Sequence, residues 1–360
     1  MVPESKTPYL RPVLEGIPPY RPGLRVVGPD GRSVKLSSNE SPFGPLTSVR
    51  EAIARASAEL NRYPDAGSVA LVEALAAHVG VPVDHVAVGA GSVGLLQQLL
   101  EAVGEPGAEV VYAWRSFEAY PLLADLAGVR SVRVPIRDEA HDLGALADAV
   151  TENTRMVLVC NPNNPTGTTV HREELAAFLD RVPDHVLVVL DEAYHEYVRD
   201  PRVPDGVELY RDRPNVAVLR TFSKAYGLAA LRLGYLVAHP HVAIAVNKTL
   251  VPFAVNHLAQ AAGIASLAAH DELMERVAAT VEERSRVRDA LIASGWTVPP
   301  TEANFVWLRA GDDTLDFAAA CAEAGVAVRP FAGEGARVSL GTVEEDDVFL
   351  AVATAYAHRR

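Results

Sequence analysis

The chain has 360 residues, 49% apolar and 22% charged, which is too long for one minimal core and too apolar for an intrinsically disordered protein. Its formal net charge is −13, from 33 basic and 46 acidic residues, and this charge disfavours nucleic acids and anionic membranes as partners. Apolar runs such as residues 186–190 are far too short to span a bilayer, and two cysteines exclude a disulfide framework.

Lysine and cysteine are both scarce. The only lysines are Lys6, Lys35, Lys224 and Lys248, so 29 of the 33 basic residues are arginines. A lysine inside an apolar segment therefore needs a specific reason. The two cysteines, with an N-terminus that lacks an apolar signal segment, are typical of a cytoplasmic protein. We expect no metal site.

Predicted helices and strands alternate along most of the chain. A Pro- and Gly-rich arm comes first, at residues 1–44, and the clearest helix is at 92–103. Strands alternating with helices predict a large α/β domain over residues 45–262, with a mostly parallel sheet covered on both faces. The predicted strands of this domain are 86–88, 110–112, 132–136, 156–160, 186–190, 216–219 and 235–238.

The last hundred residues have a different pattern. A long charged helix is expected first and another helix at the end, with short strands between them. This pattern predicts a smaller α+β domain over residues 263–360, which the N-terminal arm joins. The predicted helices are 271–294 and 345–358, and the strands are 304–308, 326–328 and 337–340.

A glycine turn follows the first predicted strand. Gly89, Gly91 and Gly94 match the G-x-G-x-x-G pattern of dinucleotide-binding proteins. The next strand, however, ends without the acidic residue that such proteins use to bind a ribose. A glycine turn before a helix also binds phosphate through free backbone N–H groups. We favour a phosphate site, with a purely structural turn as the alternative.

Two polar segments follow later strands, whose carboxyl ends meet at one edge of a parallel sheet. The segment NPNNPTG, residues 161–167, is either only a rigid turn or a turn that presents an asparagine to a ligand. Asp191 ends a buried strand, where a carboxylate needs a cation. That cation belongs either to a structural ion pair or to a ligand.

Lys224 lies among apolar neighbours in the segment TFSKAYG. Poor solvation lowers the pKa of a lysine and leaves the free amine available to form an imine. Ser223 and Arg232 are placed to hold a phosphate dianion. Arg337 begins an apolar strand, where it binds either a ligand carboxylate or an acidic residue of the chain. Together with Asp191, these groups fit pyridoxal 5′-phosphate, which has an aldehyde, a phosphate and a pyridine nitrogen.

The motifs NPNNPTG, DEAY, TFSKAYGLAALRLG and RVSLGT, in this order, resemble the fold-type I pyridoxal-phosphate aminotransferases of the histidinol-phosphate aminotransferase group. The resemblance covers nearly the whole chain. The segments WRSFEAYP and ANFVWL are most similar to the actinobacterial aromatic, or phenylalanine, aminotransferases of that group. The resemblance implies a large mostly parallel α/β/α domain, a smaller α+β domain, and a homodimer with shared active sites.

The resemblance also implies a role for each matching residue. Lys224 would form the internal aldimine and move a proton, and Asp191 would pair with the pyridine nitrogen. Asn164 and Tyr194 would hydrogen-bond the ring oxygen, and Phe117 would stack on the ring. The phosphate would be held by Gly91, Ser92, Val93, Ser223 and Arg232, with Tyr63 from the neighbouring subunit. The substrate would be bound by Arg337, Asn164 and, as weaker candidates, Arg329 and Tyr20.

The expected reaction moves an amino group between phenylalanine or tyrosine and 2-oxoglutarate, in two half-reactions of a ping-pong mechanism. Histidinol phosphate is the alternative substrate, and Arg329 would help to bind its phosphate. A nicotinamide oxidoreductase would use the glycine turn but leaves Lys224, Asp191 and Arg337 unexplained. A pyridoxal-binding transcription factor would need a DNA-binding domain, for which the arm before residue 45 is too short.

Overall fold

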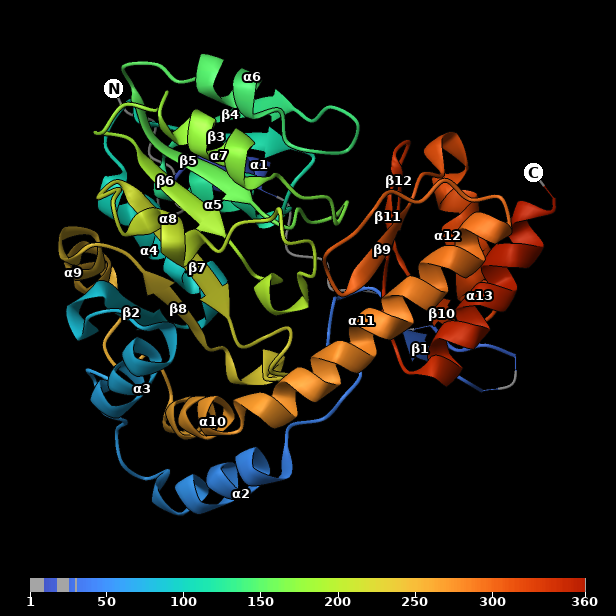
Figure 1. Cartoon of the computed structure of the whole chain (residues 1–360), viewed down its shortest axis with the longest axis horizontal. Helices are drawn as coiled ribbons and strands as arrows, with labels where there is room; N and C mark the ends of the chain where they lie inside the picture. The colour runs from blue at the N-terminus through green and yellow to red at the C-terminus, as the bar shows by residue number, and fades with distance from the viewer. Residues whose placement is uncertain (1–9, 18–25, 30, 360) are drawn as a thin grey trace, which may run out of the picture.

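A seven-stranded sheet organises the larger part of the molecule (Figure 1). The computed structural model describes residues 10–17, 26–29 and 31–359. Among the described strands of this sheet, β8 alone runs in the direction opposite to the others, so the predicted mostly parallel sheet is confirmed. The spatial order is β2 (Val86–Gly89), β8 (Gly234–Val237), β7 (Val216–Thr221), β6 (Leu187–Asp191), β5 (Thr154–Cys160), β3 (Glu109–Trp114) and β4 (Arg130–Pro135).

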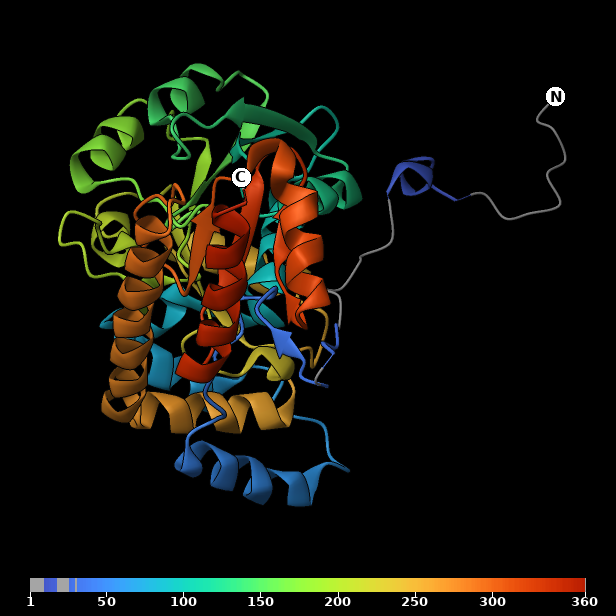
Figure 2. The same ribbon diagram turned by 90° about the vertical axis from the view of Figure 1, so that its right-hand side faces the viewer.

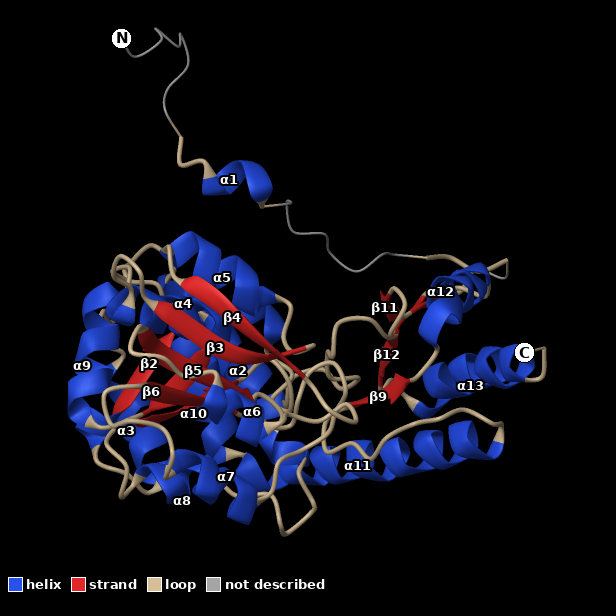
Figure 3. Cartoon of the chain, turned by 90° about the horizontal axis from the view of Figure 1, so that it is seen from above, coloured by secondary structure: helices blue, strands red, loops and turns tan. Residues whose placement is uncertain are grey.

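Helices cover both faces of this sheet (Figure 3). Consecutive strand residues point to opposite faces, so Met156 and Leu158 belong to one core whereas Val157 and Val159 belong to the other. The first core includes α4 (Gly91–Val103), α5 (Ala119–Ala127) and α9 (Pro240–Thr249). The second includes α3 (Val69–Val79), α6 (Leu143–Asp148), α7 (Arg172–Leu179), α8 (Gly206–Tyr210) and α10 (His257–Ala268).

The C-terminal part of the chain forms a smaller body beside the large sheet. The long helix α11 (His270–Ala293) leads into it, and α12 (Thr314–Glu323) and α13 (Val343–Ala357) pack side by side there (Figure 2). Its antiparallel sheet has the order β11 (Arg329–Phe331), β12 (Gly335–Ser339) and β9 (Phe305–Leu308).

The N-terminal arm adds a strand to this smaller body. Strand β1 (Val34–Lys35) pairs in parallel with β10 (Val326–Ala327). The sequence did not predict β1, β11 or the short helix α1 (Val13–Gly16). Among the described residues, none of the helices has the length and apolar character that a membrane span requires. The remaining elements are α2 (Thr47–Ala56) and 3₁₀ turns at Ser57–Glu59, Val83–His85, His195–Tyr197, Ala229–Leu231 and Gly311–Asp313.

Candidate active site

The candidate residues follow the carboxyl ends of neighbouring parallel strands. Cys160, which ends β5, is paired with Asp191, which ends β6. Asp191 is paired in turn with Leu219 of β7. The loop 161–167, Asp191 and the segment that carries Lys224 therefore leave the sheet side by side. This edge of a parallel sheet is the usual place for a ligand.

Asp191 is a buried acid with one oxygen engaged. Its Oδ2 accepts a hydrogen bond of 2.7 Å from the hydroxyl of Tyr120 in α5. Its Oδ1 is buried and has no hydrogen-bond partner of normal geometry among the described residues. Burial raises the pKa of Asp191, against the opposing effects of Tyr120, the Ala193 N–H and Lys224. Such a carboxylate is suited to a cationic or N–H group of a ligand.

The amine of Lys224 is held close to this acid and to Arg337. Its Nζ donates a 3.2 Å hydrogen bond to the carbonyl of Ser38 and lies 5.9 Å from the centre of the Tyr194 ring. Burial, followed by the positive charge of Arg337, lowers the pKa of Lys224 to about 7. A large fraction of the amine is therefore neutral, and nucleophilic, at physiological pH.

A hydroxyl, a guanidinium and a helix N-terminus meet at the start of α4. Arg232 Nη1 donates a 3.2 Å hydrogen bond to Oγ of the buried Ser223. Gly91 has φ +76°, a backbone conformation in which other residues are strained, and a Cβ added there would lie 2.5 Å from Nη2 of Arg232. The N-cap residue of α4, Ala90, provides no side-chain hydrogen bond to the first turn. This combination is suited to a phosphate.

A third group of side chains connects the two bodies of the molecule. Arg337, from β12, donates hydrogen bonds to Asn164 Oδ1 at 2.5 Å and to the carbonyl of Ser37 at 2.7 Å. The hydroxyl of Tyr194 accepts a 2.9 Å hydrogen bond from Nδ2 of Asn39. Burial raises the pKa of Tyr194, whose hydroxyl therefore stays neutral as a hydrogen-bonding group.

The remaining predicted site residues are not part of the three groups of side chains described above. Phe117 contacts Tyr120 edge-on, with ring centres 5.5 Å apart. Tyr63 is 82% exposed and stacks on Phe253 instead of contacting the residues above. Arg329 forms an ion pair with Glu118. Tyr20 lies outside the described residues.

Sequence reasoning missed several residues that contact the candidate residues, among them Tyr120 and Asn39. Tyr120 binds Asp191, and Asn39 binds Tyr194. Tyr120 carried a usable signal, because it lies three residues after Phe117 on the same side of a helix turn. Asn39 carried none, because its contact depends on how the N-terminal arm folds back over the strand ends.

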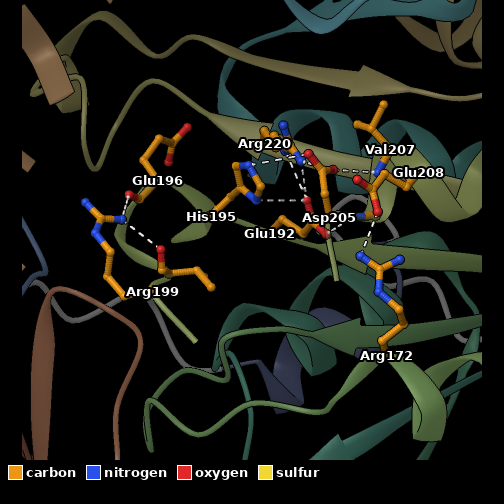
Figure 4. A network of polar contacts seen from close by, with 11 residues as sticks. Arg172, Glu192, His195, Glu196, Arg199, Asp205, Val207, Glu208 and Arg220 are labelled. Atoms are coloured by element: carbon orange, nitrogen blue, oxygen red, sulfur yellow. Dashed lines mark hydrogen bonds and ion pairs between the residues drawn. The ribbon is translucent and has the colours of Figure 1, made fainter. Parts of the chain in front are cut away.

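A second polar network surrounds Glu192, the residue that follows Asp191 in the chain (Figure 4). Arg220 donates hydrogen bonds to Glu192 at 2.7 Å and to Asp205 at 2.6 Å, and Glu192 also accepts from the Gly206 N–H. His195 lies 3.7 Å from both carboxylates. The two acids and the histidine have a spacing compatible with a metal ion. We assign no metal here, because Arg220 already supplies the positive charge.

Comparisons with known proteins match one family over most of the chain. The model of the family described as aminotransferase class I and II matches residues 32–352. An aromatic amino acid aminotransferase of Thermobifida fusca is 74% identical over 356 residues, which cover 99% of both chains. A protein of the same name from Streptomyces coelicolor is 59% identical over 96% of this chain and 97% of its own.

Solved structures also match over nearly the whole chain. The crystal structure of a histidinol-phosphate aminotransferase from Sinorhizobium meliloti, in complex with pyridoxal 5′-phosphate, has a TM-score of 0.88 to this chain. The two sequences are 33% identical, and the match covers 99% of each chain.

Proposed function

Because the chain belongs to the class I and II aminotransferases, we propose that it transfers amino groups between aromatic amino acids, phenylalanine and tyrosine, and 2-oxoglutarate. Its substrates are small molecules, namely amino acids and 2-oxo acids, as in the family. The observation that carries the aromatic assignment is the pair of relatives at 74% and 59% identity, both named aromatic amino acid aminotransferase and both matched over nearly their full length.

The cofactor is pyridoxal 5′-phosphate, and the residues present fit it. Three separate features match its three functional groups. The unpartnered Oδ1 of Asp191 suits the pyridine nitrogen, and the neutral amine of Lys224 suits the aldehyde. Ser223, Arg232 and the first turn of α4 suit the phosphate, with Gly91, Ser92 and Val93 giving backbone N–H groups. When bound, the cofactor supplies an electron sink for the negative charge that develops at the substrate Cα.

The chain's own residues then act around that Cα. Lys224, with its lowered pKa, is the group that accepts and returns the Cα proton. Arg337 holds the substrate α-carboxylate through its planar guanidinium. Asn164 and Tyr194 hydrogen-bond the cofactor ring oxygen. Asp191 stays ionised once a cationic nitrogen lies beside it, because an opposite charge lowers the pKa of a carboxyl.

We also propose a homodimer in the cytoplasm. Tyr63 and Phe253 present an exposed, stacked aromatic pair, which a second subunit would cover. In that arrangement Tyr63 reaches the phosphate of the neighbouring site. Both cysteines are buried and unbridged, as is usual in a reducing compartment.

Histidinol phosphate, the alternative substrate, has weaker support. The Sinorhizobium meliloti enzyme that carries this name is 33% identical, well below the relatives named for aromatic amino acids. In addition, Arg329, the residue expected to bind its phosphate, is engaged by Glu118.

The test is a half-reaction titration of the purified holoenzyme. Phenylalanine and histidinol phosphate are added to separate samples without a 2-oxo acid, and the visible absorbance of the lysine-bound cofactor is followed. We expect phenylalanine to remove this absorbance at much lower concentration than histidinol phosphate does. The reverse order would assign the chain to histidinol phosphate. The Lys224→Ala variant should lack both the absorbance and nearly all turnover.

A further inference from the structure

Three side chains of the small antiparallel sheet lie in one row that faces the candidate site. Arg329 of β11 is paired with Arg337 of β12, which is paired with Trp307 of β9. Directly opposed residues of antiparallel strands project to the same face, with Cβ atoms about 4.5–5.5 Å apart. Each of the three contacts the large body, at Glu118, Asn164 and Glu139 respectively. Arg329 is therefore a second arginine beside the proposed carboxylate-binding Arg337.

The charge of this second arginine is already neutralised. The Nη2 of Arg329 lies 2.9 and 3.0 Å from the two carboxylate oxygens of Glu118, and its Nε lies 3.1 Å from one of them. Such a bidentate pair fixes both the position and the direction of the guanidinium. Glu118 directly follows Phe117, the proposed ring-stacking residue, so the carboxylate is placed beside the ligand position by the same turn.

We propose that Glu118 is a positioning residue that determines specificity: by holding and neutralising Arg329, it restricts the anion site to a single carboxylate on the substrate Cα. This inference rests on the proposed function. A phosphate ester at the same position, as in histidinol phosphate, is longer and carries two negative charges. To bind it, Arg329 must leave its partner, and the dianion must then lie near the Glu118 carboxylate.

The pair has little to do with the stability of the fold. The side chains of Arg329 and Glu118 are 27% and 40% exposed, and ion pairs exposed to this degree contribute little to folding. The variants Glu118→Gln and Glu118→Ala should therefore fold normally. A purely structural contact between the two bodies would leave the choice of substrate unchanged when it is removed.

The experiment compares two substrates that share one side chain. Phenylalanine and phenylalaninol phosphate differ only in the anionic group on Cα. In the holoenzyme with Glu118→Gln, we expect the ratio of kcat/KM for the phosphate over the amino acid to rise at least about tenfold. The change should lie in KM. The equilibrium Kd of 3-phenylpropyl phosphate, measured against that of 3-phenylpropionate, should fall by a similar factor without any turnover.

Two variants serve as controls. Glu334→Gln removes the same charge from another ion pair between the two bodies, the one with Arg115, and should leave the ratio unchanged. In the double variant Glu118→Gln with Arg329→Gln, the kcat/KM ratio of the phosphate over the amino acid should return to about the wild-type value. An unchanged ratio in Glu118→Gln, or an equal rise in Glu334→Gln, would overturn the inference while the proposed function stands. A wild-type enzyme that does not act on phenylalanine would overturn both.

Discussion

Lys224 shows how one residue gains its reactivity from neighbours that are distant in sequence. Burial and Arg337 lower its pKa to about 7, whereas the carboxylates of Glu40 and Asp191 partly oppose this. The apolar neighbours in TFSKAYG were enough to predict the direction of the shift. The second cause, Arg337, comes from the small body and depends on how the two parts of the chain pack.

The titration of Lys224 has a measurable effect on the stability of the cofactor-free protein. Between the native pKa of about 7 and the usual value of 10.5, the unfolded chain binds more protons than the native protein. The contribution of Lys224 to stability therefore rises with pH across this range. We expect Lys224→Met to have a higher Tm than the wild type at pH 7, and this difference to shrink toward pH 10. A difference that is constant with pH would contradict the lowered pKa, and the exposed Lys248→Met is the matched control.

Asp191 allows a second test at the same scale. Asp191→Asn keeps the shape and the contact with Tyr120 but removes the charge that faces the proposed pyridine nitrogen. Loss of one preorganised electrostatic group lowers kcat by about 10²–10³. Because a buried carboxylate is costly, the cofactor-free variant should be at least as stable as the wild type. Steady-state kinetics and thermal unfolding check both parts, and unchanged turnover would show that Asp191 does not act on the ring.

The sequence predicted those site residues that can be recognised from their neighbours along the chain. Lys224 is a rare lysine in an apolar segment, and Asp191 is an acid at the end of a buried strand. Glu118 had no such signal, because its partner Arg329 lies 211 residues away. Tyr120 carried a local signal in its spacing from Phe117, but its role depends on a contact across the sheet edge with Asp191, which the sequence does not show.

The adjacent acids Asp191 and Glu192, at the end of β6, have different roles because their side chains point to opposite faces of the sheet. Side chains of consecutive strand residues point to opposite faces, so Asp191 reaches Tyr120 in α5 while Glu192 reaches Arg220 on the other side. The sequence left open whether Asp191 belonged to a structural ion pair or to a ligand. In the structure, the neighbouring Glu192 forms the buried ion pair.

The Glu192–Arg220 pair should be important for stability, because both side chains are less than one-tenth exposed. Arg220→Met leaves Glu192 and Asp205 near one another without their cation, and breaking a buried pair in this way costs about 3–5 kcal/mol. The double variant with Glu192→Gln should recover part of this loss. Urea unfolding measures both.

An exposed ion pair gives the comparison. Arg181 and Asp148 are more than half exposed, so Arg181→Met should cost less than about 1 kcal/mol. If Arg220→Met and Arg181→Met lowered the free energy of unfolding equally, burial would not explain the contribution of Arg220 to stability.

At the scale of elements, the central strands were predictable from their continuous apolar runs. The short polar strands were not predictable in this way. Strand β1 has two residues and β11 has three, including Arg329 and Pro330, so neither shows an apolar pattern. Both exist because a partner strand elsewhere in the chain supplies their hydrogen bonds. The antiparallel insertion of β8 between β2 and β7 was also not predictable, because strand order depends on contacts that local patterns do not record.

At the scale of the molecule, polar contacts between the two bodies surround the candidate site. Besides Arg329 with Glu118, Glu334 binds Arg115, and Glu139 accepts hydrogen bonds from Arg309 and Trp307. These contacts fix the small body over the strand ends that carry the proposed cofactor residues. One expected residue, Tyr63, is not part of this arrangement within a single chain. Its 82% exposure requires either a solvent-facing aromatic side chain or a second subunit.

Mixing two defective subunits distinguishes these possibilities. Lys224→Ala removes the proposed nucleophile, and Tyr63→Ala removes the proposed contact with the neighbouring phosphate. In a hybrid dimer with shared sites, one site carries both defects and the other carries neither, so random exchange restores about a quarter of the wild-type sites. Activity should therefore rise when the two purified variants are mixed under conditions of subunit exchange. If Tyr63 acted within its own subunit, every site of the hybrid would keep one defect, and mixing would restore nothing.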